Sequence, residues 1–132
     1  MIAEPAARAR ALADFHFRTE PRLWADLVES GLVPDTVAAR REWECFALYA
    51  LVRGLVAAGG FNLATATGVD ALHESVLERW AAEGAAEEPL ETRRARAAER
   101  YAEYGLLGQS LPAAGGAQVA RRLGEAAARH LA

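Results

Sequence analysis

The sequence of 132 residues contains no lysine, so its fifteen basic residues are all arginine. It has one cysteine, one methionine and one isoleucine, whereas alanine supplies 32 residues. Arginine in place of lysine, together with so much alanine, indicates the codon bias of a GC-rich bacterial genome more than a function. The single cysteine, Cys45, excludes a disulfide within the chain and fits a reducing compartment. We therefore expect a cytoplasmic bacterial protein.

Long apolar runs are also missing. The longest, CFALYALV at residues 45–52, ends at Arg53 and is far shorter than the roughly 20 residues that span a bilayer. The net charge is −3, which gives no electrostatic reason to expect a nucleic acid or an anionic membrane as partner. No P-loop, GxSxG, HExxH or Rossmann fingerprint is present. The sequence therefore indicates no catalytic residue and no cofactor.

Proline, glycine and capping residues divide the chain into six predicted helices. Pro5, Pro21 and Pro89 each fit the first turn of a helix, where a missing backbone donor costs nothing. Thr67 with Asp70 three residues later resembles a capping box. No stretch alternates with a period of two, which argues against strands. The predicted helices cover residues 5–17, 20–31, 35–58, 67–84, 88–105 and 116–132.

These helices predict one all-α domain over residues 1–132, a single-domain bundle of about six helices. The third predicted helix is apolar nearly all round from Cys45 to Ala58, so we expect it to be central and the most buried. One of its sides leaves room for a neighbouring backbone, because it carries Ala47, Ala50, Gly54 and Ala57. In the fifth helix, the arginines at 93, 96 and 100 are expected on an outward face among acids.

All three histidines, His16, His73 and His130, fall on apolar faces of three different predicted helices. Asp70 precedes His73 by three residues, so one helical turn presents a carboxylate and an imidazole together. A metal site would use His73, Asp70 and His16, because these positions lie at the same end of an alternating bundle. The alternative is that each histidine is a core or rim residue bonded to a carbonyl or a carboxylate.

Arg53 is unusual because it lies in the most apolar helix. It must either reach water along its stem or pair with an acid, for which Glu74 and Glu78 are the candidates. A functional alternative is an anion-binding arginine in a pocket with Tyr49. A small-ligand site of this kind would lie between the third and fourth predicted helices and use His73, Arg53, Tyr49 and Glu74.

Two functions stay open at this point. The first is a protein with no evident catalysis that acts by protein–protein contact as a homodimer. Only 36 residues are large apolar ones, and the first and last predicted helices have thin apolar stripes, so a subunit interface would add stability. The second is a small-ligand- or metal-binding helical domain around His73, Tyr49 and Arg53, which would include an enzyme.

Overall fold

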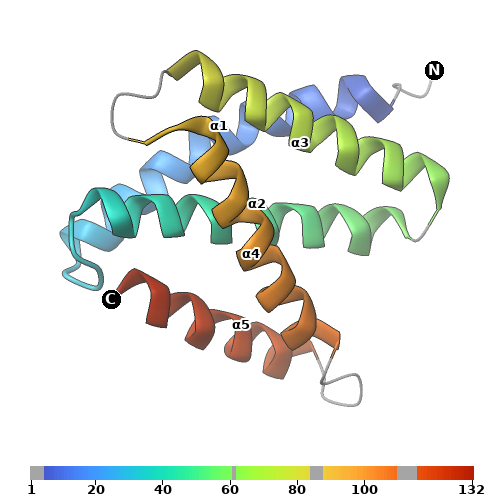
Figure 1. Cartoon of the computed structure of the whole chain (residues 1–132). Helices are drawn as coiled ribbons and strands as arrows, with labels where there is room; N and C mark the ends of the chain where they lie inside the picture. The colour runs from blue at the N-terminus through green and yellow to red at the C-terminus, as the bar shows by residue number, and fades with distance from the viewer. Residues whose placement is uncertain (1–4, 61, 84–87, 110–115) are drawn as a thin grey trace.

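The part of the chain that the structure describes consists of helices and their connections, with no strand. A computed structural model describes residues 5–60, 62–83, 88–109 and 116–132. Within these ranges the helices (Figure 1) are α1 Pro5–Glu29, α2 Val37–Gly59, α3 Leu63–Glu83, α4 Leu90–Gln109 and α5 Gly116–Leu131. The all-α class is confirmed, whereas the predicted count of about six helices is slightly too high.

The surplus predicted helix results from Pro21, which lies inside α1 and does not end it. Proline in a helix interior removes a backbone hydrogen bond and costs about 3 kcal/mol. Here the proline is exposed, and contacts on either side hold the helix. Trp24 is buried, and Trp43 Nε1 donates a hydrogen bond to the backbone oxygen of Glu20 at 3.2 Å. Tertiary packing therefore continues the helix through the proline.

Two other predicted boundaries are wrong. Helix α3 begins at Leu63 rather than Thr67, because the Asn62 side chain accepts a hydrogen bond from the backbone nitrogen of Thr65 at 2.9 Å and caps the helix there. Helix α4 continues past Gly105, which was expected to end it. Glycine within a helix costs only about 1 kcal/mol, so packing of the flanking residues is enough to extend α4.

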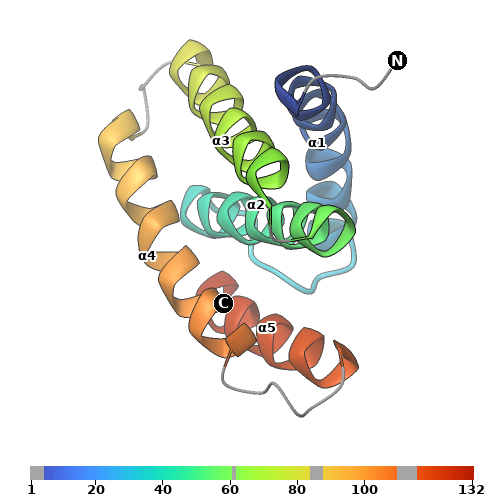
Figure 2. The same cartoon turned by 90° about the vertical axis from the view of Figure 1, so that its right-hand side faces the viewer.

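Helix α2 is the central helix, as predicted, but it is not the most buried. Within its apolar stretch from Cys45 to Ala58 only Cys45 and Leu48 are buried, and Ala50, Gly54 and Ala57 are exposed instead of packing against a neighbouring backbone. Helix α2 contacts each of the other four helices. Figure 2 shows α1 and α3 on one side of α2 and α5 on the other, with α4 running past its edge. The helix begins after Thr36, whose side chain accepts a hydrogen bond from the backbone nitrogen of Ala39 at 3.1 Å. It ends at Gly59 and is capped by Gly60, where φ is 79°. Most surfaces between helices therefore include α2.

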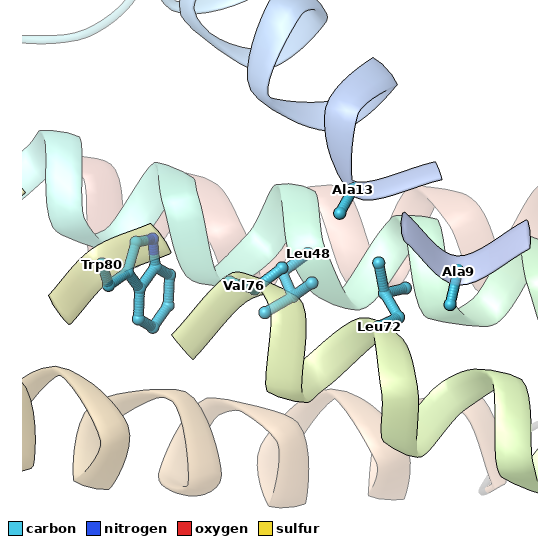
Figure 3. Close-up of a cluster of buried hydrophobic side chains, with 6 residues drawn as sticks. All are labelled: Ala9, Ala13, Leu48, Leu72, Val76 and Trp80. Carbon is cyan, nitrogen blue, oxygen red and sulfur yellow. The ribbon is translucent and has the colours of Figure 1, made fainter. Parts of the chain in front are cut away.

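Buried apolar side chains form three clusters, and α2 contributes to each. The first joins α1, α2 and α3 (Figure 3) and consists of Ala9, Ala13, Leu48, Leu72, Val76 and Trp80. The second joins α4 and α5 and consists of Tyr104, Leu123, Ala126 and Ala127, with Phe46 and Tyr49 of α2 packed against it. The third consists of Trp24, Ala39 and Leu131. The core is therefore divided, and α2 connects its parts.

Candidate functional site

The contact between α2 and α4 is polar, contrary to the expectation that the arginines of α4 face outward. Arg93 is only 4% exposed, and its Nη2 donates to Glu44 Oε2 at 2.8 Å. Its guanidinium carbon also lies 4.5 Å from the ring centroid of Trp80. Arg100 donates to both carboxylate oxygens of Glu42, at 2.7 and 2.9 Å. These arginines join helices instead of facing solvent.

A signal for this interface was present in the sequence. Arg93, Arg96 and Arg100 repeat at a helical spacing that places them on one side of α4. Glu42 and Glu44 lie directly before the apolar stretch of α2 that begins at Cys45, and an acid that is removed from solvent requires a partner. Because charged residues are mostly exposed to solvent, the arginine pattern on α4 alone predicted that this side of the helix faces solvent, which is wrong. Since these charges are paired with one another, the interface has a structural role.

His73 lies on α3 and forms a pair with a tyrosine of α4. Its Nε2 is 2.7 Å from the hydroxyl oxygen of Tyr101, and the two ring centroids are 5.2 Å apart. Burial lowers the pKa of His73, although the nearby carboxylate of Asp70 acts to raise it. Burial also raises the pKa of the Tyr101 hydroxyl. At neutral pH the pair is therefore an uncharged imidazole and a protonated phenol.

A pocket of about 240 Å³ opens beside this pair, between α2, α3 and α4. Its lining is mostly apolar and includes Leu48, Val76, Leu77 and Trp80. Alanines 97 and 98 on α4 also line it and leave space where longer side chains would fill it. Arg94 completes the lining; it is exposed and makes no ion pair with any residue that the structure describes. The pocket therefore combines an apolar interior with a few polar groups.

The other predicted ligand-site residues do not line this pocket. The Tyr49 hydroxyl donates a hydrogen bond to the backbone oxygen of Tyr104 at 3.2 Å. Arg53 is exposed and has no ion-pair partner within the described ranges. Glu74 is exposed on α3. The structure thus places His73, Tyr101 and Arg94 around one pocket. Tyr49 does not line it but packs against Tyr101, with the two ring centroids 5.6 Å apart, whereas Arg53 and Glu74 are exposed outside it.

The predicted metal ligands are His73, Asp70 and His16. Among the residues that the structure describes, no group of three histidine, cysteine, aspartate or glutamate side chains is placed to hold a metal ion. Asp70 is exposed on the same helix as His73, whereas His16 is buried on α1. His16 and His73 therefore do not form a common ligand set with Asp70 in this part of the chain.

His16 belongs instead to a buried polar group on α1. It lies one turn before Glu20, and both side chains are buried. Burial, with a smaller effect of Arg40, lowers the pKa of His16 to about 4. Burial raises the pKa of Glu20 to about 7, although Arg40, whose Nη2 is 2.7 Å from Glu20 Oε1, acts to lower it. The two side chains thus depart from their ordinary pKa values in opposite directions.

His130 and Cys45 have surroundings that suit structural roles. His130 Nε2 lies 2.8 Å from a carboxylate oxygen of Glu103, which links α5 to α4. Cys45 is buried on α2, and burial is the main cause that raises the pKa of its thiol to about 12. A thiol with so high a pKa is a poor nucleophile at neutral pH, because the thiolate is the reactive form.

The corner between α2 and α3 has two hollows on its surface. One, of about 500 Å³, lies between α1, α2 and α3; the other, of about 610 Å³, lies between the end of α2 and the start of α3. Asn62 and Thr65 line both hollows, and Leu63 lines the second. We call this region the corner surface and define it by Phe15, Leu55, Val56, Asn62, Leu63 and Thr65.

No family model, no curated protein and no solved structure matches this chain. In the described ranges, no helix combines the length and the apolar character needed to cross a membrane. The class of protein that the fold defines is an all-α helical bundle. Its function must therefore be inferred from the corner surface and from the pocket beside His73.

Proposed function

We propose that the protein acts by contact with other proteins and that it binds a second copy of itself through the corner surface. The observation that carries this proposal is the meeting of two hollows, of about 500 and 610 Å³, at one corner of the molecule. Single exposed leucines are ordinary on protein surfaces, whereas a contiguous apolar patch marks an interaction site. The two hollows share Asn62 and Thr65, so their mostly apolar linings adjoin at one surface.

Two large exposed side chains add to the apolar area of the corner surface. Leu63 is 83% exposed and Phe15 is 51% exposed. Complete burial of a leucine or phenylalanine side chain is worth about 1.5–3 kcal/mol, so covering both would contribute substantially to association. Phe15 lines the hollow beside α1, and Leu63 lines the other one. One partner that covers both hollows would bury both residues.

A second copy of the chain suits this surface because a two-fold dimer uses the same patch on both subunits. The corner surface has a projecting Leu63 beside a hollow, so each copy offers both a side chain and a place to receive one. Its charges are of both signs: Arg8 lines one hollow and Asp70 the other. Both are exposed, and neither has an ion-pair partner in the described ranges. A two-fold arrangement can place Arg8 opposite the partner's Asp70.

The backbone beneath the corner surface is firmly held. Asn62 Nδ2 donates to the backbone oxygen of Gly59 at 2.7 Å, while Asn62 Oδ1 caps α3. A Cβ atom at Gly59 would lie 2.5 Å from Thr65 Oγ1, so the two helix ends approach as closely as a glycine permits. A preformed surface loses little conformational freedom on binding, which favours association.

The cellular setting is part of the same proposal. The free, buried cysteine Cys45 supports a reducing compartment, and we propose the bacterial cytoplasm. The net charge of −3 supports proteins, rather than nucleic acids, as partners.

Sedimentation velocity of the wild-type protein and two variants tests this proposal. We expect a dimer for the wild type at concentrations of about 1–100 µM, the range of modest dimer affinities. Leu63→Arg should be a monomer with unchanged helical circular dichroism, because the replaced side chain is exposed. The matched control is Leu106→Arg on α4, where the leucine is 68% exposed and outside the corner surface; it should remain a dimer. A monomeric wild type, or a dimeric Leu63→Arg variant, would overturn the proposal.

A further inference from the structure

The pocket beside His73 is independent of the corner surface and has its own chemistry. Its volume of about 240 Å³ lies just below the roughly 300–1,000 Å³ of typical small-molecule pockets. It therefore has room for a small organic molecule. Because Leu48, Val76, Leu77 and Trp80 provide most of its interior, the body of such a molecule must be apolar.

The polar end of the ligand is indicated by Arg94. Neighbouring arginines on α4 are already bound to carboxylates: Arg93 to Glu44 and Arg100 to Glu42. Arg94 lines the pocket, is exposed, and has no acidic partner in the described part of the chain. No aspartate or glutamate lines the pocket. The electrostatics therefore favour an anion and oppose a cation.

The Tyr101 hydroxyl supplies a second group for the same anion. With the Nε2–H tautomer of His73, the imidazole donates to the phenol oxygen, and the phenol proton is then free to be donated to a ligand. One guanidinium and one hydroxyl match a singly charged carboxylate, which accepts hydrogen bonds at two oxygens. A phosphate dianion would need more positive charge than this pocket has.

We propose that the pocket formed by α2, α3 and α4 binds a small apolar monocarboxylate, with Arg94 and the His73–Tyr101 pair holding the carboxylate and the apolar lining holding its body. The ligand class is that of aryl or branched-chain carboxylic acids of about ten non-hydrogen atoms. In this site His73 remains a ligand-binding residue, as in the site expected from the sequence, whereas Arg94 and Tyr101 take the places of Arg53 and Tyr49. It does not depend on dimer formation.

Calorimetric titration of the full chain with phenylacetate and with its neutral analogue phenylacetamide tests the proposal. A ligand of this size reaches a dissociation constant of about 0.1–1 mM. Phenylacetate should bind in that range, and phenylacetamide should bind at least about tenfold more weakly, since only the carboxylate is charged. Equal affinities for the two compounds, or no binding of phenylacetate, would overturn the proposal.

Variants locate the site. Arg94→Gln should weaken phenylacetate binding about tenfold and leave phenylacetamide binding unchanged, because the exposed side chain loses only its charge. Tyr101→Phe should weaken the binding of both compounds, since either can accept the phenol proton. The matched control is Arg121→Gln on α5, an exposed arginine outside the pocket, which should bind both compounds like the wild type. Unchanged phenylacetate binding in Arg94→Gln would contradict the assignment.

Discussion

Replacing Arg93 by methionine should lower the free energy of unfolding by about 3 kcal/mol. Methionine keeps most of the side-chain length but removes the charge that Glu44 binds in a buried site, at 2.8 Å. Removing one partner of a buried ion pair costs about 3–5 kcal/mol, because the other charge is left uncompensated. The lost contact with the Trp80 ring adds about 0.5–2 kcal/mol. Arg41, 2.5 Å from Glu44, remains as a partner, so we expect the lower end of the range.

Arg79 provides a matched control, since it makes the same two kinds of contact at the surface. Its Nη2 lies 3.2 Å from Asp14, and its guanidinium carbon lies 4.6 Å from the ring centroid of Phe17. The Arg79 and Asp14 side chains are 47% and 68% exposed. Solvent screens such pairs, so Arg79→Met should cost at most about 1 kcal/mol.

Urea unfolding followed by far-ultraviolet circular dichroism measures both costs by linear extrapolation. A third variant, Glu44→Gln combined with Arg93→Met, should recover about 1 kcal/mol or more of the loss, since it removes the buried charge that Arg93→Met leaves behind. If Arg93→Met and Arg79→Met differ by less than about 1 kcal/mol, burial does not strengthen the Arg93 contacts, and our reasoning is refuted.

Denaturation at several pH values should give opposite slopes for two α1 variants. In Glu20→Gln, stability should rise between about pH 4 and 6.5, because the His16 pKa is about 4 when folded against 6.5 when unfolded, and the unfolded chain binds the extra proton. In His16→Gln, stability should fall between about pH 4.5 and 7, because the Glu20 pKa is about 7 when folded against 4.5 when unfolded. Slopes of the same sign in the two variants would contradict one of the two pKa assignments. Pro21→Ala should raise the free energy of unfolding by about 1–2 kcal/mol, since it restores a backbone donor at an exposed helical position, and a urea midpoint no higher than that of the wild type would disprove this.

The helical class and the central place of α2 could be predicted from the sequence because they depend on local patterns. Apolar periodicity and turn residues are properties of short segments, and the ranges predicted for α2 and α5 are nearly correct. Pro21 misled the prediction because its local cost is offset by distant contacts, such as that of Trp43 with the Glu20 backbone. Tertiary packing of this kind is not visible in the order of residues.

The candidate site was predicted only in part, for a similar reason. His73 was expected on an apolar face, but its pairing with Tyr101 depends on how α3 lies against α4. Only the structure shows that Arg94 lines a pocket while Arg93 beside it is buried. Adjacent residues on a helix point about 100° apart, so a small rotation of α4 decides which arginine is buried.

The division of the core into three clusters has a consequence for how the chain loses its structure. Each cluster is small, and none would hold a domain together by itself. Since α2 side chains belong to or pack against all three, displacing this helix from one cluster uncovers the others as well. Displacing α2 therefore removes packing from all three clusters at once, whereas the contact between α1 and α3, the most extensive between two helices in the described ranges, does not involve α2. We therefore expect that loosening α2 weakens all three clusters together.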